Sequence, residues 1–193
     1  MGRSITKEEI AALDIEEFKG RIHVIDNIEN SDKATAYLSK FKFMGFDTET
    51  RPNFRKGNLN SVALIQLSTN DHCFLFRLNK IGFTPSLIRL LSNPDMLKIG
   101  LSLQDDYTSM NRRLQFTPQG FIDLQKLAPG YGIEDISLQK IYALLFRKKI
   151  SKSQRLSNWE AETLSEAQKK YAALDAWACL KIYEKLCSTN KSI

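Results

Sequence analysis

The run Phe43-Met44-Gly45-Phe46-Asp47-Thr48-Glu49-Thr50 ends an apolar segment with two acids. Its aromatic and β-branched residues predict a strand. Residues two apart in a strand point to the same face, so Asp47 and Glu49 share one face with Gly45. Two like charges on a buried face are costly without a compensating cation. The pattern is typical of a cation site, but this run alone also fits an edge strand with one solvated face.

Two further strand-like runs follow, at residues 62–68 and 73–78. The first is almost continuously apolar, which favours a central strand beside the acidic one. A polar, basic loop over residues 51–60 precedes it, and the turn signal Thr69-Asn70-Asp71 follows it. Three consecutive strands with short connections predict an antiparallel meander.

Outside this meander, helical and strand-like patterns alternate and then give way to helices. This order predicts an α/β fold, a mixed β-sheet of an antiparallel meander plus parallel strands, flanked by α-helices. We expect one domain over residues 1–193, with residues 1–20 as an N-terminal helical extension. The predicted strands lie at 21–26, 96–100 and 120–122, and the predicted helices at 7–18, 31–40, 85–91, 103–114, 123–127, 138–146 and 165–186.

Composition excludes several classes of protein. The 193 residues are 42% hydrophobic and 26% charged, which excludes a disordered chain. Three cysteines without a CxxC pair indicate reduced thiols and a cytoplasmic protein. His23 and His72 lack the spacing of zinc ligands, which argues against a His-rich zinc site. A net charge of +6 fits a polyanionic partner, and we expect neither a membrane partner nor a nucleotide cofactor.

A third acid enters from the helix predicted over residues 103–114. Leu103, Tyr107, Met110 and Leu114 have the spacing of a buried stripe, and Asp106 borders it. Asp105 groups with the wetter side, so Asp106 is the better candidate for an inward ligand. An acid in the first turn of a helix is also favoured by the helix dipole, which is the alternative.

The segment Tyr171-Ala172-Ala173-Leu174-Asp175 supplies a tyrosine and a fourth acid. Positions i and i+4 share a helix face, and Asp175 continues along that face to Cys179, Ile182 and Leu186. A Tyr hydroxyl satisfying a core carboxylate explains this pair when it is taken alone.

Together, the four acids Asp47, Glu49, Asp106 and Asp175 predict a metal centre. Oxygen ligands without His or Cys favour Mg²⁺ or Mn²⁺ over zinc. Two such divalent cations about 3.5–4 Å apart are the usual arrangement for attack on a phosphodiester. Tyr171 lies one helical turn from Asp175 and is placed to orient the attacking water.

The order Asp-x-Glu, Asp, Tyr-x-x-x-Asp resembles the DEDDy group of 3′→5′ exonucleases, and most closely the ribonuclease D and Werner-syndrome-type exonuclease domains. The resemblance runs from about Phe43 to Leu186. It includes Val62-Ala63-Leu64-Ile65-Gln66-Leu67, Lys98-Ile99-Gly100 and Ser157-Asn158-Trp159. It implies a ribonuclease H-like fold and a two-metal 3′→5′ exonuclease that releases nucleoside 5′-monophosphates.

The resemblance also assigns roles. The residue matching Asp47 touches both metals, those matching Glu49 and Asp175 hold the metal of the catalytic water, and that matching Asp106 helps to hold the second. Tyr171 matches the tyrosine that positions the nucleophile. Many family members carry an apolar or aromatic residue after the DxE motif, whereas Thr50-Arg51 follows here, so contacts to the terminal base are expected to differ. The chain looks like a stand-alone nuclease module.

Two basic clusters are candidates for phosphate contacts, which give affinity without base specificity. The expected partner is single-stranded or 3′-recessed or overhanging nucleic acid, either DNA or RNA. Solvated basic loops are the alternative. We favour packing over base stacking for the tryptophan of the second group. The predicted contact residues are Arg51, Arg55 and Lys56 after the first strand, and Lys148, Lys149, Lys152, Arg155, Asn158 and Trp159 before the last helix.

Two other readings of the acids stay open. One is a non-catalytic nucleic-acid-binding module that retains the exonuclease fold, and the other is a ribonuclease H-like endonuclease. Two further acids are excluded from the metal site, because we expect Asp123 to cap a helix and Asp135 to lie in a turn.

Overall fold

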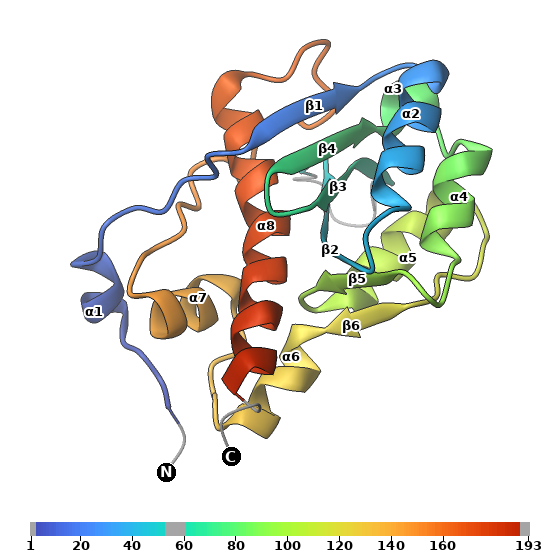
Figure 1. The fold of residues 1–193 in the computed structure, drawn as a ribbon. Helices are drawn as coiled ribbons and strands as arrows, with labels where there is room; N and C mark the ends of the chain where they lie inside the picture. Colours follow the sequence, from blue (N-terminus) through green and yellow to red (C-terminus); the bar gives the residue numbers. More distant parts are fainter. Residues whose placement is uncertain (1–2, 53–60, 190–193) are drawn as a thin grey trace.

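A six-stranded mixed sheet organises the molecule (Figure 1). The computed structural model describes residues 3–52 and 61–189. The strand order is β1-β4-β3-β2-β5-β6. The strands span β1 (Arg21–Ile25), β2 (Phe43–Thr50), β3 (Val62–Ser68), β4 (His72–Arg77), β5 (Leu97–Gly100) and β6 (Phe121–Asp123).

The predicted meander forms the centre of this sheet. β2 pairs antiparallel with β3, and β3 pairs antiparallel with β4. The pairs β1–β4, β2–β5 and β5–β6 are parallel. Every residue of β3 is buried, because helices cover both faces of the sheet there. The sequence prediction of a mixed sheet around a central meander is confirmed.

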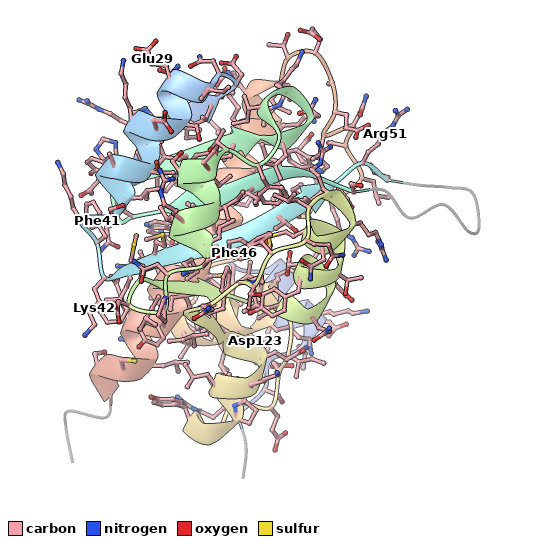
Figure 2. The ribbon with its side chains drawn as sticks, turned by 90° about the vertical axis from the view of Figure 1, so that its right-hand side faces the viewer. Glu29, Phe41, Lys42, Phe46, Arg51 and Asp123 are labelled. Atoms are coloured by element: carbon pink, nitrogen blue, oxygen red, sulfur yellow. The ribbon has the colours of Figure 1, made fainter. Side chains whose placement is uncertain are left out.

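Helices cover the two faces unequally. The long helix α8 (Glu166–Thr189) lies along one face, with α7 (Leu138–Phe146) packed beyond it (Figure 1). The other face is covered by α2 (Ile28–Leu38), α4 (Pro85–Leu91) and α5 (Leu103–Arg113). Phe46 is fully buried on this second face, whereas Arg51 lies at the surface beyond β2 (Figure 2). The shorter helices are α1 (Lys7–Ala11), α3 (Leu78–Ile81), α6 (Leu124–Leu127) and the 3₁₀ turn η1 (Ala128–Tyr131).

The contact between β2 and α8 requires a glycine. A Cβ added at Gly45 would overlap the backbone carbonyl of Ala176 and crowd Leu180. The bare backbone of Gly45 therefore lets α8 approach β2 more closely than any side chain would permit. Since Asp175 precedes Ala176 and Asp47 lies two residues after Gly45, this contact also brings two of the predicted acids together.

The prediction of a helix over residues 7–18 is wrong beyond Ala11, where α1 ends. A capping box at Thr6 starts α1 as the sequence indicates. The chain then leaves the helix because Ile15 forms a β-bridge with Lys149, and Phe18 packs edge-on against Trp177. These partners lie far along the chain and leave no local signal.

Other boundaries differ by smaller amounts. α2 begins at Ile28 and not at residue 31, because the Asn27 side chain accepts a hydrogen bond from Asn30 N at 2.9 Å. Asp135 was expected in a turn but lies buried in an extended loop. Its carboxylate accepts from Ile5 N at 2.9 Å and from Lys140 Nζ at 2.8 Å. α3 and η1 were not predicted at all.

Across residues 3–52 and 61–189, none of the helices combines the length and apolar character that a membrane crossing needs. All three cysteines are free thiols, with Cys73 and Cys179 buried and Cys187 partly buried.

Replacing Gly45 by alanine is expected to push α8 away from β2. The added methyl group has no space and should lower the free energy of unfolding by about 1–3 kcal/mol, the usual cost of overpacking. Urea denaturation of the metal-free protein measures this loss. Gly130→Ala is the matched control, because an added Cβ there meets nothing within 4 Å. It should change stability by less than about 0.5 kcal/mol. Equal midpoints for the two variants would contradict the requirement for glycine at position 45.

Candidate active site

The acids lie where β2 loses its second neighbour. β5 pairs with β2 only from Phe43 to Gly45, whereas the pairing with β3 continues to Thr50, with a register shift between Glu49 and Thr50. Burial falls accordingly, from buried at residues 44–46 to partly exposed at residues 47–50. The end of β2 is therefore accessible from one side while it stays anchored in the sheet on the other.

Three carboxylates converge at this end of β2. Oxygen atoms of Asp47, Glu49 and Asp175 all lie within 4.8 Å of one another. The alternation of the strand supplies the first two, and the close approach of α8 supplies the third. The buried stripe predicted for α8 is also present, because Cys179, Ile182 and Leu186 are at most 2% exposed. The structure thus brings together acids that lie more than 120 residues apart.

Asp106 approaches the same strand from α5, near enough for its charge to raise the pKa of Asp47, but it is not one of the three acids that converge within 4.8 Å. Its Oδ1 atom accepts a hydrogen bond from the hydroxyl of Thr48, the residue between the two strand acids. Asp105 is exposed, as predicted, and Met110 is fully buried. Leu114 was expected in the buried stripe but is 38% exposed, because α5 ends before it. No local pattern predicts the hydrogen bond between Thr48 and Asp106, because it joins residues 58 positions apart.

Asp123 positions α5, a role that sequence reasoning missed. It caps α6 as predicted, accepting from Gln125 N at 2.9 Å. Its carboxylate also accepts from Ser102 N at 2.9 Å and Leu103 N at 3.2 Å, at the start of α5. Ser102 has a φ of 61°, in the left-handed region, so the chain turns sharply into α5 there. One carboxylate thereby fixes the helix that carries Asp106.

Burial raises the pKa values of all four acids, and neighbouring acidic charges add to the rise at Asp47, Glu49 and Asp106. Desolvation, followed by the charges of Asp175, Asp106 and Glu49, raises the pKa of Asp47 well above its ordinary value. Desolvation and the charges of Asp175 and Asp106 raise the pKa of Glu49 to about 9. Burial also raises the pKa values of Asp106 and Asp175 to about 7. Buried carboxylates that repel one another favour the binding of a compensating cation.

Tyr171 lies one helical turn before Asp175, and its hydroxyl partly opposes the rise that burial causes in the pKa of Asp175. Desolvation, then the charges of Asp175 and Glu49, raises the pKa of the Tyr171 phenol above its ordinary value. The hydroxyl is therefore protonated at neutral pH and can act as a hydrogen-bond donor beside the acids. Trp159 is fully buried 6.0 Å from the Tyr171 ring, which agrees with the packing role that we favoured and leaves no exposed face for a base.

The predicted basic residues divide into two groups. Lys152 and Arg155 are exposed and lie close enough to the acids to act on them. Lys152 opposes the rise in the pKa of Asp175, and Arg155 opposes that of Glu49. Asn158 is also exposed, and its side chain accepts from Glu160 N.

The other basic side chains have partners elsewhere or fall outside the described residues. Lys148 Nζ pairs with Glu16 at 3.0 Å, and Lys149 Nζ donates to the carbonyl of Ala11 at 2.6 Å. Both bind the N-terminal segment, so the structure does not bring them to the acids. A guanidinium nitrogen of Arg51 lies 3.7 Å from a carboxylate oxygen of Glu160. Arg55 and Lys56 lie outside the described residues.

The donor set fits a hard divalent cation. The three converging ligands are all carboxylate oxygens, which Mg²⁺ and Mn²⁺ prefer. Cys179 lies on the same face of α8, and burial, followed by the charge of Asp47, raises the pKa of its thiol. A neutral thiol is a poor ligand, so this cysteine does not turn the site towards softer metals.

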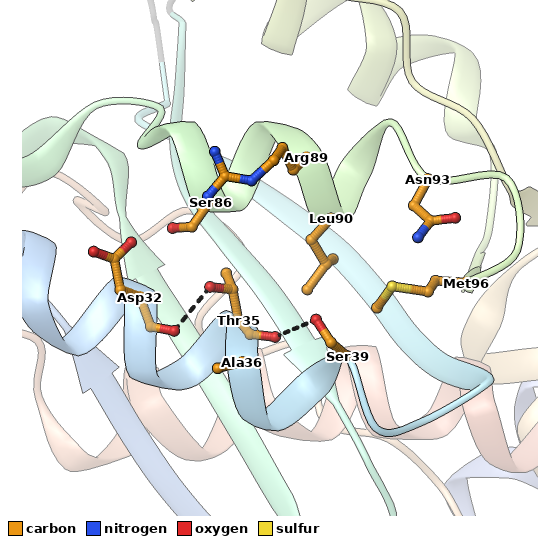
Figure 3. Close-up of a pocket in the computed structure, with 9 residues that line it drawn as sticks. All are labelled: Asp32, Thr35, Ala36, Ser39, Ser86, Arg89, Leu90, Asn93 and Met96. Atoms are coloured by element: carbon orange, nitrogen blue, oxygen red, sulfur yellow. Dashed lines mark hydrogen bonds between the residues drawn. The ribbon is translucent and has the colours of Figure 1, made fainter.

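A separate cavity of about 330 Å³ lies between α2 and α4 (Figure 3). Two of its hydroxyls are committed to carbonyls of α2, because Thr35 donates to Asp32 and Ser39 donates to Thr35. The lining includes none of the four acids, so this cavity is distinct from the acidic group at the end of β2.

The raised pKa values predict a pH-dependent stability in EDTA. Between about pH 4.5 and 9, Glu49 holds a proton in the folded protein that the unfolded chain releases. Stability should therefore fall as the pH rises through this window. Glu49→Gln removes this titration and should lose less stability than the wild type between pH 5 and pH 9 in urea denaturation. Equal losses in the two proteins would contradict the raised pKa of Glu49.

Comparisons with known proteins agree with this geometry. A profile described as 3′-5′ exonuclease matches residues 22–189. The bifunctional 3′-5′ exonuclease/ATP-dependent helicase WRN of Mus musculus is 33% identical over 162 residues, covering 81% of this chain and 12% of that protein. Ribonuclease D of Haemophilus influenzae is 31% identical over 126 residues, covering 65% of this chain and 32% of that protein.

The crystal structure of the Aedes aegypti Nibbler EXO domain has a TM-score of 0.78 at 25% identity, covering 89% of this chain and 90% of that one. The chain spans no more than about a third of the two curated relatives named above. The predicted ribonuclease H-like fold is confirmed. This chain belongs to the 3′-5′ exonuclease family, as its resemblance to the ribonuclease D and Werner-syndrome-type domains indicated.

Proposed function

We propose that this chain is a metal-dependent 3′→5′ exonuclease that releases nucleoside 5′-monophosphates from the 3′ ends of nucleic acids. The observation that carries the proposal is the convergence of Asp47, Glu49 and Asp175 within 4.8 Å at the open end of β2. Asp106 on α5 and Tyr171 on α8 flank this trio. Family membership supports the reaction class.

The site residues have three proposed roles: holding the cations, orienting the attacking water and contacting the phosphates. Asp47, Glu49 and Asp175 would hold one divalent cation, and Asp106 together with Asp47 would hold a second. When bound, Mg²⁺ or Mn²⁺ supplies Lewis-acid stabilisation of the phosphodiester and makes water a better nucleophile. The Tyr171 hydroxyl hydrogen-bonds the attacking water and fixes its direction of approach. Lys152 and Arg155 lie on the same side as the acids and contact the phosphates of the strand.

The proposed reaction is a hydrolysis, and water is the only reactant besides the nucleic acid. The oxygen of water forms a bond to phosphorus, and the bond between phosphorus and the 3′ oxygen of the preceding nucleotide breaks. The attacking water loses a proton, and the 3′ oxygen that leaves takes one up, so the protons balance. The products are a nucleoside 5′-monophosphate and a strand that is one nucleotide shorter with a new 3′ hydroxyl.

Digestion of a 3′-labelled single strand with Mn²⁺ tests the proposal. The wild type should release labelled mononucleotide, while EDTA or the Asp47→Asn substitution should abolish release. Tyr171→Phe keeps all four carboxylates, so it should lower kcat about 10²-fold, as loss of one positioned hydrogen bond does, yet bind Mn²⁺ normally in calorimetry. Release that persists in EDTA would refute the metal mechanism.

Two additional results would favour the alternatives. Cleavage of a circular single strand would indicate an endonuclease. Strand binding by the wild type without Mn²⁺ binding or turnover would indicate the non-catalytic module.

Salt dependence tests the proposed phosphate contacts. Each contact to a single strand contributes about 0.7 to the slope of log affinity against log salt concentration. Arg155→Gln should therefore reduce that slope by about 0.7, measured by fluorescence anisotropy with the Asp47→Asn protein as background. Lys33→Gln removes the same charge from α2, where Lys33 pairs with Glu29 at 2.7 Å, and should leave the slope unchanged. If the two substitutions gave the same slope, Arg155 would not contact phosphate.

A further inference from the structure

Gln66 occupies the position directly across from Asp47. The two residues are partners in the antiparallel β2–β3 register, and Leu75 of β4 is the partner of Gln66 on its other side. Residues directly opposite each other in an antiparallel pair project to the same face, with Cβ atoms about 4.5–5.5 Å apart. Because α8 packs on both β2 and β3, Gln66 lies on the α8 side of the sheet, as Asp47 does.

The amide of Gln66 is buried without a partner. Its side chain is fully buried, and within the part of the chain that the structure describes neither Nε2 nor Oε1 has a hydrogen-bond partner. Burying an unpaired amide costs free energy. Leu64 and Leu75 beside it belong to the apolar core, so an apolar side chain of similar volume would pack there without this cost. Packing alone does not account for a glutamine at this position.

We infer that Gln66 is a positioning residue for Asp47, with its Nε2 donating a hydrogen bond to the Asp47 carboxylate when a divalent cation is bound; this rests on the function proposed above. A carboxylate has two oxygens with about four lone-pair sites, so it can bind a cation and still accept from an amide. Partners of this kind orient the ligands of a metal.

The Gln66 amide carries no charge, which is an advantage for a hydrogen-bond donor opposite Asp47. A lysine opposite Asp47 would compete with the cation for the carboxylate, and another acid would add to the repulsion among Asp47, Glu49 and Asp175. An amide gives a donor without changing the charge of the site. Gln66 can therefore fix the rotamer of Asp47 while it leaves the attraction for the cation intact.

Gln66→Met tests the inference, since methionine matches glutamine in length and lacks its donor. We expect Mn²⁺ affinity, measured by calorimetry, to fall at least about tenfold, the usual range for loss of such a partner. The metal-free protein should be as stable as the wild type, or more stable, in urea denaturation. Asn111→Leu is the control, because Asn111 on α5 also carries a buried amide oxygen without a partner. It should leave Mn²⁺ affinity unchanged.

The outcomes separate this inference from the proposed function. Wild-type protein that binds no Mn²⁺ would refute the metal mechanism itself. Wild-type binding with equal affinity in Gln66→Met would overturn only the role of Gln66, as would a large loss of metal-free stability with affinity retained. If Gln66→Met does not fold, NMR of the Gln66 side-chain amide in the wild type tests the inference instead. Addition of Mg²⁺ should shift it and slow its hydrogen exchange, and an unchanged resonance would overturn the inference.

Discussion

The close approach of α8 to the bare backbone of Gly45 is the contact on which both sheet and site depend. α8 packs against β2, β3, β4 and β5, so its distance from β2 sets its distance from the sheet. Asp175 is adjacent in sequence to the residue that makes this contact. A single packing constraint therefore determines how the apolar core closes and how near the third carboxylate comes to Asp47 and Glu49.

The rest of the molecule holds these acids together against their repulsion. β3 anchors the strand acids from one side, where all its residues are buried. Asp123 ties the start of α5 to β6 and so keeps Asp106 against Thr48. The burial of β3 and the capping by Asp123 do not involve the four acids, whereas the Thr48 hydrogen bond is made by the carboxylate of Asp106 itself.

Much of the fold could be predicted because the local patterns agreed with the final structure. β2 and β3 have the predicted bounds, since their aromatic and β-branched residues suit buried strands. The convergence of Asp47, Glu49 and Asp175 could be predicted because strand and helix periodicity indicated the face of each. The prediction over residues 12–18 was wrong because Ile15 pairs with Lys149, more than 130 residues away. The same long-range pairing withdraws Lys148 and Lys149 from the acids. The Thr48–Asp106 hydrogen bond and the double capping by Asp123 likewise depend on tertiary contacts that no local pattern records.

The repulsion within the site also bears on how such a domain evolves. A random change of any one of these acids to a neutral residue would relieve electrostatic strain and make the scaffold easier to fold. Without selection on the acids, mutation would therefore lead towards more stable proteins that lack the complete acidic group. This chain carries Asp47, Glu49, Asp106 and Asp175 together, a set of mutually repelling charges that a single substitution would relieve.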